Sequence, residues 1–169
     1  MTGKLSLAEV NAMARQDFIA RFGGIAEHSP WVAEAAAGMR PFHDMAAVVS
    51  AFETAVRAAP RARRLELLRA HPDLAGRAKE ITQASRREQQ GAGLDTLTAE
   101  EFARFTSLNR RYRSAFGFPF IFAVRGATKH QILESFERRI ENSPDAEFKT
   151  ALDNVCAILR FRLEDRVQS

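Results

Sequence analysis

Apolar residues recur every three or four positions along most of the chain, a spacing typical of amphipathic helices. The first such stripe consists of Leu7, Val10, Ala14, Phe18 and Phe22. Ser6 and Glu9 form a capping box in front of it, because the serine oxygen can hold a free amide while the glutamate reaches back. Gly23-Gly24 follows the last aromatic residue and ends the pattern. We therefore expect one helix over about residues 7–22.

A proline or a capping residue marks the start of most of the later helices. Helices are expected to begin after Ser29-Pro30, Pro60 and Ser143-Pro144, and after the capping boxes Thr98–Glu101 and Thr128–Gln131. Two more are expected over about residues 45–56 and 83–90. No segment alternates convincingly between apolar and polar residues, and no internal repeat is present. The pattern predicts an all-α fold, a multi-helix bundle that forms a single domain over residues 1–169.

One aromatic segment, Phe118–Val124, departs from the helical spacing. It lies between two capped helices, and the chain offers no strand with which it could pair. Because the backbone groups of a buried strand need partners, a short extended loop is the better interpretation. We expect this loop to line a pocket, where its amides and carbonyls could bind a ligand. On its own, the segment could equally be a plug in the core.

The amino-acid composition favours a folded globular protein outside the membrane. The chain has 169 residues, of which 46% are hydrophobic and 27% charged, as is ordinary for one folded globular domain. Its longest apolar stretches are too short to cross a bilayer, so no membrane association is expected. Met1-Thr-Gly-Lys4 lacks the apolar run of a secretory signal peptide, and the single Cys156 excludes an internal disulfide. A cytoplasmic location is therefore expected.

The net charge of +4 leaves a second interpretation open. A basic helical domain could bind nucleic acid, and Arg110, Arg111 and Arg113 would favour that alternative. Acidic residues alternate with basic ones along most segments, however, which is typical of solvated helix faces. We therefore expect no nucleic-acid partner. A helical protein-interaction domain without catalysis is the other alternative.

Several polar residues stand where a purely structural pattern would place apolar ones. His71 follows an apolar helix, and Pro72 keeps it out of the helical conformation. Ser85, Glu88 and Gln89 share one face of their helix. Arg162 falls on the apolar side of the last helix, so it should meet a carboxylate or a ligand unless its head reaches solvent. Asn109 lies similarly among aromatic residues and could simply brace a neighbouring backbone.

The sequence lacks the motifs of metal-dependent, phosphate-binding and serine-nucleophile enzymes. The four histidines have no metal-ligand spacing, and the chain has neither a glycine-rich phosphate loop nor a GxSxG nucleophile elbow. No metal and no cofactor are therefore expected. Proton chemistry remains, which suits isomerases, hydratases and certain lyases.

Taken in order, the unusual features resemble one enzyme family. They are His71-Pro-Asp-Leu-Ala75, Ser85-x-x-Glu-Gln89, Gly93-Leu94, Leu108-Asn109, Tyr112, Phe116-Gly-Phe-Pro-Phe-Ile121 and Val124-Arg-Gly126. This set is similar to that of the 2-oxo-4-hydroxy-4-carboxy-5-ureidoimidazoline (OHCU) decarboxylases, and the likeness runs from about Leu7 to Val167. The resemblance implies decarboxylation of a small anionic ureidoimidazoline to (S)-allantoin, the last step of urate degradation. It also implies an all-helical homodimer that uses no cofactor.

The resemblance further assigns roles to single residues. His71 matches the catalytic histidine that donates a proton, and Glu88 matches its acidic partner. The positions that match substrate-contacting stretches are Pro72, Ser85, Arg86, Arg87, Glu88, Gln89, Phe120, Ile121, Phe122, Ala123, Val124 and Arg162. Arg86 and Arg87 receive a backbone role only. Arg160 lies close enough to Arg162 to leave open which of the two faces the pocket.

The chemistry of this reaction predicts what each group does. Donors aimed at the oxygen where charge develops usually contribute most, and the candidates are the loop amides near Ile121–Ala123, Gln89 and Arg162. His71 would deliver a proton to one face of the ring, and Glu88 would orient the imidazole.

Overall fold

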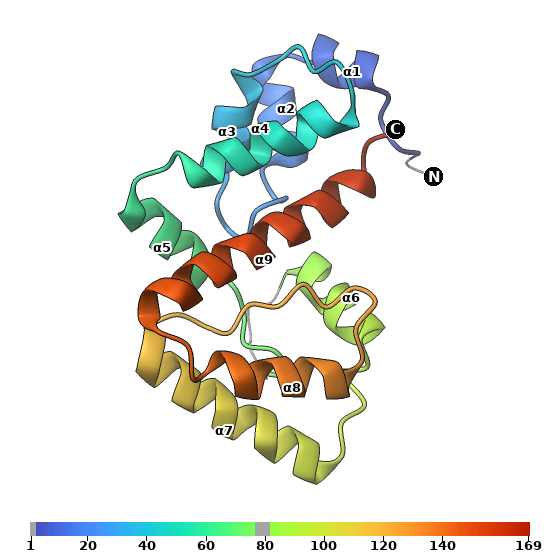
Figure 1. Ribbon diagram of the computed structural model, residues 1–169. Coiled ribbons are helices and arrows are strands. Elements are labelled where there is room, and N and C mark those ends of the chain that lie inside the picture. The colour runs from blue at the N-terminus through green and yellow to red at the C-terminus, as the bar shows by residue number, and fades with distance from the viewer. Residues whose placement is uncertain (1–2, 77–81) are drawn as a thin grey trace. The chain divides into compact units, whose positions relative to one another are not determined.

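The computed structural model describes residues 3–76 and 82–169, and within these ranges the chain forms helices and no strand (Figure 1). The helices are α1 (Leu7–Ala12), α2 (Arg15–Phe22), α3 (Trp31–Ala37), α4 (Met45–Arg57), α5 (Arg61–Arg69), α6 (Gln83–Gly91), α7 (Ala99–Phe116), α8 (Lys129–Arg139) and α9 (Pro144–Glu164). A single isolated bridge pairs Leu5 with Val167 in the described ranges. The predicted all-α class is confirmed.

The chain divides into two compact units. The first contains the residues up to Ala70 together with Cys156–Ser169, and the second contains His71–Val155. The last helix, α9, has residues in both units. The expectation of a single domain over 1–169 stays a prediction.

The expectation of one continuous helix over residues 7–22 is wrong. The capping box of Ser6 and Glu9 forms as predicted, but the backbone turns extended at Met13 and Ala14, so α1 and α2 are separate helices. The cause lies elsewhere in the first unit: the Arg40 guanidinium donates to the carbonyls of Val10 and Met13, at 3.1 and 2.5 Å. These carbonyls would otherwise accept from amides one turn later in a continuous helix.

Aromatic rings fill the core of the first unit. Phe18 and Phe22 of α2 lie 4.8 Å apart between centroids, and Phe52 of α4 packs against both at about 6 Å. Helix α4 begins where predicted because the carboxylate of Asp44 accepts a hydrogen bond from the amide of Ala47 at 2.8 Å. Its apolar face therefore points into this core, with Val48, Phe52 and Val56 buried.

The second unit begins its main helices at the predicted capping boxes. Thr98 and Glu101 cap α7, and Thr128 and Gln131 cap α8, each with both reciprocal hydrogen bonds. Gly117 ends α7 in the left-handed conformation with φ 78°, which a residue without a Cβ adopts at little cost. Helices α7 and α8 lie side by side in this unit (Figure 1).

The aromatic segment after Gly117 enters the core of the second unit. Tyr112 is fully buried, and four phenylalanine rings surround it within 6 Å, namely Phe116, Phe118, Phe120 and Phe136. Residues 119–124 belong to no helix or strand, in agreement with the predicted loop. The phenylalanine side chains thus fill the core, as in the core-plug interpretation, while the pocket-lining role of the loop stays a prediction.

Candidate active site

The segment that follows His71 is tied to two helices of the second unit. The amide of Ala75 donates to Oε1 of Gln89 on α6 at 2.9 Å. On α7, Asn109 donates through Nδ2 to the carbonyl of Leu74 at 2.9 Å, which is the bracing role considered from the sequence. Ala75 has φ 58°, a conformation that costs a non-glycine residue energy, so the bond that its amide donates to Gln89 holds a strained backbone in place. His71 itself is buried, with 7% of its surface exposed.

An ion pair adds a second link between this segment and α7. Arg113 donates through Nε to Oδ1 of Asp73 at 2.8 Å. The pair also bears on the nucleic-acid interpretation, because it neutralises one member of the basic group formed by Arg110, Arg111 and Arg113. A guanidinium that is already paired with a carboxylate contributes less positive charge to the binding of a phosphate backbone.

Helix α6 presents the predicted polar face. Thr82 caps it by accepting from the amide of Ser85 at 3.2 Å. Ser85 and Gln89 are buried and Glu88 is half-buried, whereas Arg86 and Arg87 are exposed. The exposed arginines fit the backbone role assigned to them. The bond between Ala75 and Gln89 brings the His71 segment to the same helix that carries Glu88.

The loop predicted to contact substrate is held from both sides of residue 122. Arg139 of α8 donates through Nη1 to the carbonyl of Ile121 at 2.7 Å. Asn154 of α9 accepts through Oδ1 from the amide of Ala123 at 3.0 Å. The amide of Ala123 is therefore already used, which removes it from the donors expected for substrate. Phe120, Ile121 and Val124 are buried, and the two residues between them are half-buried.

Sequence reasoning missed the buried charge network behind this loop. Glu147 of α9 is fully buried and accepts from the hydroxyl of Tyr112 at 2.6 Å, from Nε of Arg139 at 2.6 Å and from Nδ2 of Asn142 at 3.1 Å. The Arg139 guanidinium also lies over the Phe120 ring, 4.4 Å from its centroid. Burial and the bond to Glu147 raise the pKa of Tyr112 well above its ordinary range. A signal existed in the sequence, since Arg139 stands one turn after Phe136 on the apolar face of its helix.

Arg162 and its partners belong to the first unit. The Arg162 guanidinium pairs with Oε1 of Glu27 at 2.8 Å and donates to the carbonyl of Ile25 at 3.0 Å. The sequence predicted a carboxylate or a ligand for this arginine, and the carboxylate of Glu27 is present. Arg160 is half-exposed beside Glu164, so Arg162 is the buried one of the two. A contact between Arg162 and substrate stays a prediction.

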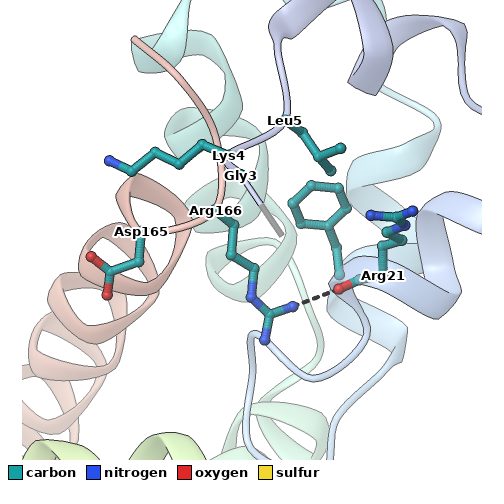
Figure 2. A pocket seen from close by; sticks show the side chains of 7 residues that line it. Gly3, Lys4, Leu5, Arg21, Asp165 and Arg166 are labelled. Carbon is teal, nitrogen blue, oxygen red and sulfur yellow. Dashed lines mark hydrogen bonds between the residues drawn. The ribbon is translucent and has the colours of Figure 1, made fainter. Parts of the chain in front are cut away.

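Each of the two units contains a hollow. In the first unit, a hollow of about 230 Å³ is lined by Gly3, Lys4, Leu5, Arg21, Phe22, Asp165 and Arg166, none of which was predicted as a site residue (Figure 2). Figure 2 shows the Arg166 guanidinium directed at the carbonyl of Arg21, 2.5 Å away. In the second unit, Phe122 and Ala123 line a hollow of about 420 Å³ together with residues just before α8 and along its length.

The described part of the chain also bears on metal binding and on membrane insertion. Neither of its ranges holds a group of three or more histidine, cysteine, aspartate or glutamate residues arranged to bind a metal ion. Among the helices of residues 3–76 and 82–169, none combines the length and the apolar character that crossing a bilayer requires.

Comparison with known proteins gives one consistent result. The sequence model of the family described as OHCU decarboxylase matches residues 11–164. The 2-oxo-4-hydroxy-4-carboxy-5-ureidoimidazoline decarboxylase of Haloferax volcanii is 45% identical over 166 residues, which cover 98% of both chains. The uric acid degradation bifunctional protein of Bacillus subtilis is 40% identical over 95% of this chain and 32% of its own length.

A solved structure agrees with the sequence matches. The crystal structure of (S)-allantoin synthase superposes with a TM-score of 0.78 at 32% identity, covering 96% of this chain and 54% of that one. The fold, the order of the motifs and the full-length match to the Haloferax volcanii protein all lead to the same assignment. The chain belongs to the OHCU decarboxylase family.

Proposed function

We propose that this chain decarboxylates 2-oxo-4-hydroxy-4-carboxy-5-ureidoimidazoline to (S)-allantoin without a cofactor, as the last step of urate degradation. The observation that carries the proposal is the 45% identity to a decarboxylase of that name over 98% of both chains. The names of two further relatives, which refer to uric acid degradation and to (S)-allantoin synthesis, support the same reaction.

The protein has to stabilise the electron pair that carbon dioxide leaves behind. Breaking the carbon–carbon bond places that pair on the ring carbon, from which it spreads onto the ring carbonyl and imine. Donors fixed in advance at these atoms lower the barrier. The amides of Ile121 and Phe122 remain candidates now that Ala123 donates to Asn154. Gln89 uses its oxygen on Ala75, so its NH₂ group is the end that could face the substrate.

The second requirement is a proton for one face of the ring carbon. His71 is suited to deliver it, because the ordinary pKa of imidazole lies near neutrality. We assign Glu88 the role of orienting the imidazole and favouring its protonated form. A positioned acid of this kind typically contributes about 10²–10⁴-fold to the rate. The bond from Ala75 to Gln89 supports this pairing, since it joins the His71 segment to the helix of Glu88.

The remaining assignments complete the proposal. Pro72, Ser85, the backbone of Arg86 and Arg87, and the loop 120–124 contact the anionic substrate, and Arg162 contributes positive charge. The resemblance to the family supports a homodimer and a cytoplasmic location. These points are proposals that the family relation supports.

The activity can be tested with urate as starting material. Urate oxidase and the hydrolase that follows it generate the unstable ureidoimidazoline acid in the cuvette, and the chain is added or omitted. We expect the intermediate to decay faster with the chain present. Equal decay rates with and without the chain would overturn the proposal. A filter-binding assay at low salt tests the nucleic-acid alternative, for which we expect no retention.

A further inference from the structure

Two side chains outside the predicted site hold the two peptide units on either side of Phe122. Arg139 binds the carbonyl of Ile121, and Asn154 binds the amide of Ala123. Both anchors stand on helices, α8 and α9, and both lie in the second unit with the loop. Neither Arg139 nor Asn154 is among the positions that match the motifs of the family.

The hydrogen bonds of Arg139 and Asn154 fix the directions in which the backbone N–H and carbonyl of Phe122 point. Both units are trans, because the only cis bond in the described ranges joins Arg40 to Pro41. In a trans unit the carbonyl and the amide hydrogen point in opposite directions. The N–H of Phe122 therefore points away from Arg139, and the carbonyl of Phe122 points away from Asn154. The N–H and the carbonyl of Phe122 thus each point away from the anchor of their own peptide unit.

The anchors are themselves fixed. Arg139 is 7% exposed, and its guanidinium is held by Glu147 at 2.6 Å and by the face of the Phe120 ring. Asn154 donates through Nδ2 to the carbonyl of Thr150 at 3.0 Å, so its amide cannot rotate without losing a bond. The buried carboxylate of Glu147 offsets the charge of Arg139, which means that the network orients the loop without adding net charge there.

We propose that Arg139 and Asn154 are positioning residues, which set the backbone of Phe122 so that its N–H and carbonyl bind the substrate. An adjacent donor and acceptor match a ureido or lactam edge, which offers a carbonyl and an N–H side by side. This inference rests on the function proposed above, because it concerns the same substrate. A purely structural role for the network is the competing explanation.

The chain offers a matched pair of variants to separate these explanations. Asn154→Ala removes the partner of the Ala123 amide, whereas Asn142→Ala removes a bond to Glu147 in the same network without touching the loop. Because small misplacements of a reacting group cost up to about 10²-fold, we expect Asn154→Ala to lower kcat/KM by about 10- to 100-fold.

A second variant tests the Arg139 anchor without leaving a buried charge unpaired. Replacing both Arg139 and Glu147 by Met and Leu exchanges the ion pair for apolar side chains, a change that buried pairs often tolerate. We expect this double variant to keep its helical circular dichroism and to lose activity, since the Ile121 carbonyl has lost its partner.

The closing experiment measures kcat, KM and the affinity for (S)-allantoin of the full chain and of its Asn154 and Asn142 variants. The inference predicts that Asn154→Ala weakens binding and turnover, and that Asn142→Ala lowers only the melting temperature. Equal effects of the two alanine substitutions would overturn the inference while leaving the proposed function intact. An unaltered chain that neither binds (S)-allantoin nor turns over substrate would remove the proposed function and the inference with it.

Discussion

The hydroxyl of Tyr112 provides the sharpest test of the buried network. Tyr112→Phe removes one oxygen atom, which donates to the fully buried Glu147 at 2.6 Å. The ring keeps its neighbours, because its contacts with Phe116, Phe118 and Phe136 do not involve the hydroxyl. The substitution therefore isolates a single hydrogen bond to a charged acceptor.

The structure sets the size of the expected effect. A hydrogen bond to a charged group contributes about 1.5–3 kcal/mol, against about 1 kcal/mol for a typical neutral pair. Glu147 retains its bonds to Arg139 and Asn142, so the carboxylate does not become unpaired. We expect the free energy of unfolding to fall by about 2 kcal/mol, within that range.

Urea unfolding followed by circular dichroism measures this quantity. Thr106→Val is a suitable control, because the Thr106 hydroxyl also donates a hydrogen bond, at 2.9 Å to the carbonyl of Phe102, but is exposed to solvent. The control should change the free energy of unfolding by no more than about 0.5 kcal/mol, as surface substitutions usually do. A loss below about 0.5 kcal/mol for Tyr112→Phe would refute the claim that this bond is buried and charge-assisted.

Three further predictions concern titration. The pKa of Tyr112 is raised in the folded chain, so its contribution to the free energy of unfolding is present below the ordinary value of about 10 and falls above it. The phenolate absorption of this single tyrosine should therefore appear only as helical dichroism is lost. Phenolate formation in the folded chain would contradict this. Hydrogen bonds from Lys129 and from the amide of Thr98 lower the pKa of Glu101 to about 2, so its stabilisation is present above about 4.5 and is lost toward pH 2. Urea unfolding of Glu101→Gln should then differ from the unaltered chain at neutral pH and converge with it near pH 2, whereas a constant difference would argue against the pairing. Glu88→Gln should move the alkaline limb of the pH–rate profile to lower pH, because His71 is required in its protonated form and Glu88 favours that form; an unchanged profile would show that Glu88 does not influence His71.

Most helices could be predicted because their signals are local. The capping boxes at Thr98 and Thr128 and the glycine at 117 fix helix ends through bonds that span three or four residues. The break between α1 and α2 could not be predicted, since it depends on Arg40, about 30 positions away. The local pattern favoured one helix over residues 7–22, whereas the hydrogen bonds of the distant Arg40 guanidinium separate α1 from α2.

In the candidate site, too, some residues could be predicted from the sequence and others could not. Motif positions such as His71 and Glu88 could be proposed because they match the motifs of the family, and Asn109 indeed braces the backbone of Leu74. The partners of the loop could not be proposed from spacing. Glu147 meets Tyr112 across 35 positions of the chain, and Arg139 reaches Ile121 across 18, so only the folded structure brings them together.

Chiral analysis of the allantoin formed by a histidine variant tests the central claim most directly. His71→Ala is compared with His130→Ala, which alters an exposed histidine on α8. Both variants should fold, and each is supplied with urate, urate oxidase and the hydrolase. We predict (S)-allantoin from the unaltered chain and from His130→Ala, and racemic allantoin from His71→Ala. Optically active product at an undiminished rate from His71→Ala would contradict the assignment of His71 as proton donor.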